Sequence, residues 1–197
     1  MIITRLENTG KNKVKVYLDD RYRFTLYDRE IKKYGLIEEG NMAETLLNEL
    51  YNTAIKRAKQ KAMALLKHMD RTEAELKRKL EMAGFSGDII QEAIGYVTSY
   101  HYIDDLRYAS SYVRLRKSSK SKRQIIGELQ QKGISGTDIQ EALSSEYESE
   151  EEAIQREISK KFSDVKSLTR KERQKIAAKL YRKGYGMDLI RHYMSLE

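Results

Sequence analysis

Three stretches of this chain end in the same pattern, and their spacing constrains the fold more than any single motif does. Each has a leucine, a glycine four residues later, an apolar residue and a closing apolar pair: Leu80-Gly84-Phe85-Ile90-Ile94, Leu129-Gly133-Ile134-Ile139-Leu143 and Leu180-Gly184-Tyr185-Ile190-Met194. The glycines lie 49 and 51 residues apart. A period near fifty residues indicates one supersecondary unit repeated in a row. We therefore expect an elongated helical array.

Each stretch also carries residues that begin and end helices. A hydroxyl residue is followed three positions later by Glu or Gln in Thr72-x-x-Glu75, Ser121-x-x-Gln124 and Thr169-x-x-Glu172. This is the capping box, in which two side chains bond to the free backbone N–H groups of a helix start. Apolar residues follow at helical spacing up to the glycine, where a left-handed residue is expected to end the helix. Ser86 and Ser135 are the expected caps of the next helix in the first two copies.

A further helix is predicted before each pair, so each repeat holds three helices. The first pair spans Thr72–Ala83 and Gly87–Ser99, and the preceding helices are predicted over Asn52–Met69, Asp104–Lys117 and Ser149–Phe162. In the third copy the cap lies 15 residues before the glycine, against 12 in the others, which adds about one helical turn. The acidic segment Ser144–Glu152 is expected to begin a solvated helix.

The first fifty residues have a different pattern. Val14–Leu18 and Tyr22–Leu26 alternate around Asp19-Asp20, which predicts a β-hairpin with a tight turn, and Ile2–Glu7 alternates weakly. A short helix is predicted near Asp28–Tyr34, and another helix after Gly40-Asn41. The fold class is therefore mainly α: a small β-hairpin and helix cap over residues 1–51 precedes three-helix repeats over 52–100, 101–147 and 148–197.

Composition narrows the classes of protein that this chain can be. It has no cysteine, which excludes a disulfide scaffold, a thiol nucleophile and a cysteine-based metal site. No apolar run approaches the roughly 18 residues that span a membrane, and the sequence has no apolar segment typical of a signal peptide. The chain is expected to be soluble, cytoplasmic and monomeric, without contact to a membrane.

Positive charge is the main functional signal. The net charge is +8, and basic residues recur on the corresponding helix of every repeat. In the third copy they fall within about 80° of one another on a helical projection, opposite the apolar residues. A solvated face is one interpretation, and an anionic surface such as a nucleic-acid backbone is the other. The candidate binding residues are Lys171, Lys175, Lys179 and Arg182, with the weaker counterparts Lys77, Lys79, Lys122 and Arg123.

Catalytic and metal-binding patterns are weak. Asp20 with Glu30-Ile31-Lys32 imitates the carboxylate and lysine set of a metal-dependent nuclease, but such triplets arise readily in a chain this rich in charge. Asp104-Asp105 fits a helix cap and dipole partner better than a cation site. The histidines are scattered. We therefore expect no enzyme activity, metal or cofactor. The tyrosine cluster is expected to pack rather than to stack on bases; it comprises Tyr100, Tyr102, Tyr108 and Tyr112.

Three stretches together resemble the RecX family, the bacterial regulators of the RecA recombinase. They are Arg71–Leu80 leading to Gly84-Phe85, Tyr102–Ala109, and Ile125–Leu129 leading to Lys132-Gly133-Ile134. The likeness covers about residues 55–195 well and the first fifty loosely. One departure is Ser121-Lys122, where family members commonly carry glycine.

The resemblance implies a regulator that binds in the groove of the RecA–DNA filament. Such a protein inhibits ATP turnover, filament growth and strand exchange, and so acts in DNA repair, recombination and the SOS response. Its expected partners are the RecA filament, single-stranded DNA and, as a second form, double-stranded DNA. The alternative is a stand-alone DNA-binding protein without sequence specificity. If the basic residues of these helices are only an incidental DNA contact, the recombinase-binding face is expected near Arg107, Tyr108 and Arg114.

Overall fold

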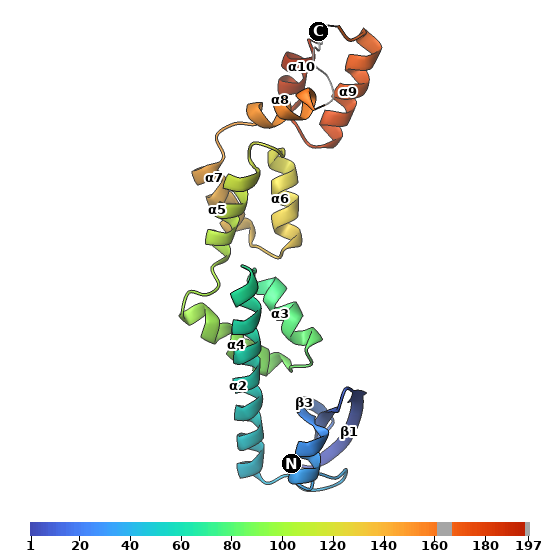
Figure 1. Cartoon of the computed structure of the whole chain (residues 1–197), viewed down its shortest axis with the longest axis vertical. Coiled ribbons are helices and arrows are strands. Elements are labelled where there is room, and N and C mark those ends of the chain that lie inside the picture. The colour runs from blue at the N-terminus through green and yellow to red at the C-terminus, as the bar shows by residue number, and fades with distance from the viewer. Residues whose placement is uncertain (161–166, 196–197) are drawn as a thin grey trace. The chain divides into compact units, whose positions relative to one another are not determined.

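The computed structural model describes residues 1–160 and 167–195. The chain divides into two compact units, residues 1–103 and 104–197. The first unit holds a three-stranded sheet and four helices, and the second holds the other helices of the described residues (Figure 1).

The sheet of the first unit is an antiparallel meander in the order β1-β2-β3. Its strands are β1 (Ile3–Gly10), β2 (Lys13–Leu18) and β3 (Arg21–Tyr27). Asp19 and Asp20 both have positive φ, as the tightest hairpin turns require, so the predicted hairpin is confirmed. A third strand, β1, pairs along β2 and enlarges the expected hairpin. Its alternation in the sequence is weak because only Ile3 is buried along this edge strand.

Helix α1 (Asp28–Lys33) lies where a short helix was predicted, and Gly35 follows it with φ +60°. Helix α2 (Glu44–His68) corrects the prediction, because it joins the two helices expected on either side of residue 51 into one of 25 residues. The apolar stripe continues from Leu50 through Ala54, Ala58 and Ala62 without a helix breaker, and this explains why the helix does not stop.

The remaining helices fall where the repeats predicted them. They are α3 (Glu73–Met82), α4 (Gly87–Ser99), α5 (Asp105–Arg116), α6 (Lys122–Gln131), α7 (Gly136–Glu146), α8 (Glu151–Ser159), α9 (Arg170–Arg182) and α10 (Met187–Met194). Helix α9 is three residues longer than α3 and α6, as expected. The expected end of the helix before it, Phe162, lies outside the described residues. Separate apolar clusters form under α5–α7 and under α8–α10.

The repeated glycines end helices in the same way in all three repeats. Gly84, Gly133 and Gly184 have φ of +88°, +81° and +91°. In the first repeat, the Phe85 N–H donates to the Leu80 carbonyl at 3.2 Å, and the Gly84 N–H donates to the Glu81 carbonyl at 2.9 Å. The other two repeats make the corresponding pairs of bonds. This is the Schellman motif, whose apolar contact explains why leucine and the residue after glycine repeat together.

The predicted capping boxes begin α3, α6 and α9. Ser135 caps α7 through the Asp138 N–H, as expected. Ser86 occupies the corresponding position before α4, but its side chain makes no capping hydrogen bond there. The acidic segment is divided, because Glu146 ends α7 and α8 begins at Glu151. Between them, a Glu150 carboxylate oxygen accepts a hydrogen bond from the Lys122 N–H at 2.7 Å.

Candidate interface of the helical repeats

The predicted basic stripe lies on the outer side of α9. Lys171, Lys175 and Arg182 are exposed and Lys179 is partly buried, whereas Ala177 and Leu180 of the same helix belong to the buried cluster of the third repeat. The stripe therefore points away from the core, and its side chains are accessible to an anionic partner.

The counterparts on α3 and α6 are less uniform. Lys77 forms an ion pair with Glu73 at 2.6 Å, so its charge is already matched, while Lys79 is exposed. Lys122 is exposed as well. Arg123 is exposed, but its aliphatic stem lies against Gly184: a Cβ placed on that glycine would come within 2.7 Å of Arg123 Cβ. Lys79 and Lys122 are thus the two counterparts whose side chains most resemble the α9 stripe.

The alternative surface on α5 has one arginine that is open to solvent and one that is paired with a carboxylate. Arg107 is exposed. Arg114 donates to both carboxylate oxygens of Glu146, with Nε–Oε2 and Nη2–Oε1 distances of 3.0 and 2.5 Å. This pairing raises the pKa of Arg114 and lowers the pKa of Glu146. An anion that binds at Arg114 must therefore compete with a carboxylate, whereas Arg107 is the more available of the two.

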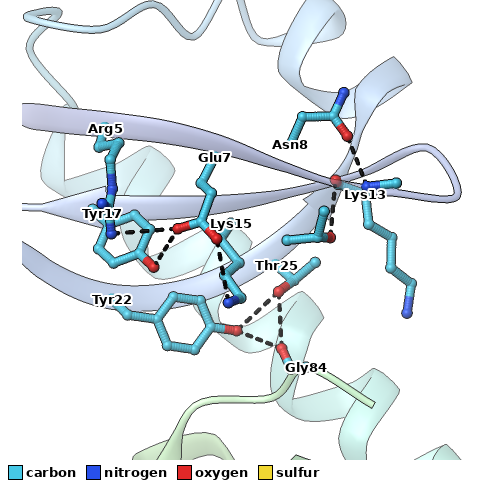
Figure 2. Close-up of polar contacts among 11 residues, drawn as sticks. Arg5, Glu7, Asn8, Lys13, Lys15, Tyr17, Tyr22, Thr25 and Gly84 are labelled. Carbon is cyan, nitrogen blue, oxygen red and sulfur yellow. Dashed lines mark hydrogen bonds and ion pairs between the residues drawn. The ribbon is translucent and has the colours of Figure 1, made fainter. Parts of the chain in front are cut away.

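The end of α3 contacts the sheet through a group of donors that the sequence did not reveal. The hydroxyls of Tyr22 and Thr25 both donate to the Gly84 carbonyl, and Figure 2 shows the two side chains pointing toward that oxygen. Lys13 Nζ donates to the preceding carbonyl, that of Ala83, at 3.3 Å. Burial raises the pKa of Tyr22, which keeps its phenol protonated as a donor. These bonds satisfy carbonyls that a helix end leaves without partners.

A corresponding contact joins the second and third repeats. The Ser121 hydroxyl, whose oxygen caps α6, also donates to the Lys183 carbonyl at the end of α9, at 2.6 Å. Lys183 in turn bonds Glu157 of α8 at 2.5 Å through its side chain. Burial is the largest influence on Glu157 and would raise its pKa, but the bond from Lys183 and the charges of the nearby lysines together lower that pKa.

The tyrosines divide into two groups. Tyr108 and Tyr112 are stacked with ring centroids 6.4 Å apart and pack against the cluster of the second repeat, so the packing interpretation is confirmed for them. Tyr100 and Tyr102 are also stacked on each other but remain 60% and 47% exposed, so for this pair the packing interpretation stays a prediction.

The acidic residues of the weak catalytic patterns have structural roles. Asp104 caps α5, because its carboxylate accepts from the Arg107 N–H at 2.8 Å, as predicted. Asp20 lies in the hairpin turn, whereas Glu30 binds both terminal nitrogens of Arg57, at 3.0 and 2.6 Å. Burial would raise the pKa of Glu30, but the bonds from Arg57 and from the Tyr27 N–H outweigh it and lower that pKa. Over residues 1–160 and 167–195, no three His, Asp or Glu side chains gather as metal ligands would.

Comparison with known protein families matches all three repeats. Models of the first, second and third three-helix domains of RecX match residues 58–96, 104–143 and 148–194. A regulatory protein RecX of Clostridium botulinum (strain Eklund 17B / Type B) is 33% identical over 96% of this chain and 92% of its own. The RecX of Caldanaerobacter subterraneus is 32% identical over the whole of both chains.

Solved structures share the fold. A crystal structure of regulatory protein RecX has a TM-score of 0.66 and 22% identity, and covers 100% of this chain and 99% of that one. The crystal structure of RecX from Lactobacillus salivarius has a TM-score of 0.61 and 24% identity, and covers 74% of this chain and 99% of that one.

Tandem three-helix domains behind a small sheet, with cations on their outer helices, define a class of helical-repeat protein. In the described part of the chain, no helix is both long and apolar enough to cross a bilayer. The matches to three successive domains and to full-length relatives identify the particular kind: the chain belongs to the RecX family of regulatory proteins.

Proposed function

We propose that this chain is a non-catalytic regulator that binds in the groove of the RecA–DNA filament. There it inhibits RecA ATPase activity, filament extension and strand exchange, and so modulates DNA repair, recombination and the SOS response. The observation that carries the proposal is the full-length match to relatives named regulatory protein RecX, which includes every repeat. A cytoplasmic location follows from this role, because the recombinase and its DNA are there.

The exposed cations support a mechanism by occupancy. Lys171, Lys175 and Arg182 form a stripe that an anionic surface can approach, and Lys79 and Lys122 offer similar charges on two other repeats. Each contact of this kind is weak alone. Several weak contacts on covalently joined repeats add through effective concentration, so the chain can hold neighbouring parts of a filament together without chemistry.

The second candidate is a stand-alone DNA-binding protein without sequence specificity. The net charge of +8 favours it, because phosphate neutralisation needs no partner protein. A RecA ATPase assay on single-stranded DNA separates the two candidates. A regulator inhibits at a ratio of protein to DNA far below coating, whereas a DNA-binding competitor inhibits only when it covers the strand.

The role of the stripe is tested by reversing the charge of three of its residues in the triple variant Lys171→Glu, Lys175→Glu, Arg182→Glu. We expect weaker DNA binding with a flatter salt dependence, by roughly 0.7 in the slope of log K for each single-strand phosphate that the variant no longer neutralises. We also expect relief of ATPase inhibition at unchanged helix content. The matched control reverses two lysines and one arginine that are exposed elsewhere: Lys56, Lys67 and Arg191.

Three outcomes are informative. Loss of both activities in the stripe variant, but not in the control, supports the proposal. Loss of DNA binding with inhibition retained moves the recombinase-binding face elsewhere, with Arg107, Tyr108 and Arg114 as the next surface to test. If neither activity changes, the stripe is a solvated face and the assignment of these residues is wrong.

A further inference from the structure

A basic cleft lies within the first unit, apart from the stripe on the repeats. It has a volume of about 700 Å³ and lies between the sheet, α1, α2 and the end of α3. Its cations come from three elements: Lys13 from β2, Arg29 from α1, and Arg57 and Lys61 from α2. No carboxylate occurs among its described lining residues. A cleft lined by charges of one sign concentrates ligands of the opposite sign.

Two of these cations are held in place by the protein. Lys13 Nζ donates to the Ala83 carbonyl at 3.3 Å, and Arg57 is fixed by the two bonds to Glu30. The Tyr27 ring adds a second constraint, because the guanidinium carbons of Arg57 and Arg29 lie 5.1 and 5.5 Å from its centroid. The cleft therefore presents positioned guanidinium groups, which suit the oxygen geometry of phosphates.

The other two cations of the cleft are accessible to a ligand. Arg29 and Lys61 are exposed, and neither forms a salt bridge with any residue in the described part of the chain. Glu30 forms its ion pair with Arg57 and its charge also acts on Arg29, but one carboxylate beside four cations leaves the lining with a net positive charge. An anion that enters the cleft would give these side chains the partner that the fold does not provide.

The cleft continues along α1 into a second hollow of about 640 Å³. The two hollows share Tyr27 and Arg29, and the second adds Lys32, Asn12 and a single carboxylate, Asp28. A track with cations along its length fits successive phosphates of a chain better than it fits one isolated phosphate. Contacts between cations and phosphates position a strand but carry no sequence information.

We infer that this cleft of the N-terminal unit binds the phosphodiester backbone of a nucleic acid strand, without sequence preference, through Arg29 and Lys61 as the accessible contacts. The inference deepens the proposed function by giving the N-terminal sheet and its helices a binding role of their own. Its test uses no recombinase, so it can fail while the proposed regulation of RecA stands, and the reverse.

The test is a salt titration of full-length protein binding to a fluorescent 30-nucleotide oligothymidylate. Replacing both cations, Arg29→Gln with Lys61→Gln, should reduce the slope of log K against log salt by roughly 1.4, because each neutralised phosphate of single-stranded DNA contributes about 0.7. The charge-preserving pair Arg29→Lys with Lys61→Arg should retain most of the wild-type slope. Circular dichroism checks that helix content is unchanged.

The matched control is Arg21→Gln with Lys67→Gln, which removes one arginine and one lysine that are exposed in the same unit but lie outside the cleft. We expect its slope to stay near that of the wild type. An equal reduction in both double variants would overturn the inference, because the effect would then be one of net charge. Competition by polyglutamate at equal charge concentration, as strong as that by unlabelled oligothymidylate, would overturn it in favour of an acidic protein partner.

Discussion

The helices α3 and α9 end in the same turn, yet each turn contacts a different kind of neighbour. At the end of α3, the carbonyls of Ala83 and Gly84 accept bonds from Lys13, Tyr22 and Thr25 of the sheet. At the end of α9, the carbonyl of Lys183 accepts a bond from Ser121, the cap of α6. Ala83 and Lys183 occupy the same position, the C-cap, in their two helices.

The difference shows what the repeat needs from its surroundings. A Schellman turn leaves carbonyls at the partly negative end of a helix, and any donor nearby can satisfy them. A sheet supplies side-chain donors in the first unit. A helix start supplies both a hydroxyl and the partly positive end of a dipole in the second. The same sequence unit can therefore follow a β-structure or another helical repeat.

The largest effect is expected from adding a methyl group at the two glycines. Gly84→Ala and Gly184→Ala should each cost about 1–2 kcal/mol because both residues are left-handed. Gly184→Ala should cost roughly 1–3 kcal/mol more, because the new Cβ lies 2.7 Å from Arg123 Cβ, whereas at Gly84 it lies 3.4 Å from the Thr25 hydroxyl. Urea unfolding followed by circular dichroism measures both variants.

Gly127→Ala is the control for this pair of variants. Gly127 lies inside α6 with nothing within 4 Å of the added atom, so alanine there should stabilise the protein by about 0.5–1 kcal/mol. If Gly84→Ala and Gly184→Ala prove equally costly, the contact of the α9 turn with Arg123 contributes nothing, and the surroundings of the two turns do not distinguish them.

A smaller effect separates two hydroxyls that both cap helices. Ser121 and Thr169 each accept from the N–H three residues on. The Thr169 hydroxyl donates to Glu172 of its own exposed capping box, whereas the Ser121 hydroxyl donates to the Lys183 carbonyl of another repeat. Both alanine variants should lose about 1 kcal/mol from the cap. Ser121→Ala should lose about 1 kcal/mol more, because the Lys183 carbonyl then lacks its partner. Faster hydrogen exchange at the Gly184 and Tyr185 amides, in Ser121→Ala alone, would locate the additional loss at the α9 turn.

The smallest expected effect is a dependence on pH that only one of the two turns has. Lys183 bonds Glu157, whose pKa is lowered in the folded protein, so this bond stabilises the fold above the unfolded pKa of a glutamate and is lost as pH falls through the lowered value. The donors to the Ala83 and Gly84 carbonyls, by contrast, are a lysine ammonium group and two hydroxyls. As pH falls through the lowered pKa of Glu157, the end of α9 should therefore loosen before the end of α3.

Glu157→Gln supplies the measurement. The variant should be less stable than the parent at neutral pH by at most about 1 kcal/mol, because the lysine is partly exposed to solvent. The difference should shrink as pH falls through the lowered pKa of Glu157, because the parent carboxylate then becomes protonated. A difference that persists unchanged at low pH would mean that packing, not charge, accounts for the contribution of Glu157.

Local chemistry explains why so much of the fold could be predicted. Capping boxes and left-handed glycines are set by residues a few positions apart, so Thr72, Ser121 and Thr169 located three helix starts, and the three glycines located their ends. The continuous α2 was missed because Gly40-Asn41 and Asn52 suggested two starts, while the buried alanines that join them read as ordinary helix formers.

Less of the candidate site than of the fold could be predicted from the sequence. A helical projection could place Lys171, Lys175 and Arg182 on one outer face, since this follows from the period of a helix. It could not pair Arg114 with Glu146, 32 positions away, nor bring Lys13, Arg29 and Lys61 to one cleft. Such contacts depend on how elements distant in the chain pack, and no local pattern encodes them.

The unbroken length of α2 fixes how the two ends of this helix are oriented relative to each other. Its 25 residues extend over about 37 Å, and the exposed fractions of Ala54, Ala58 and Ala62 are 2%, 0% and 0%. Side chains this small let neighbouring backbones approach closely, and α2 packs against β3 as well as against α3 and α4. Deleting one residue from the middle of α2 would turn its two ends by about 100° relative to each other. Deleting seven residues would nearly restore their orientation while shortening the helix by about 10 Å.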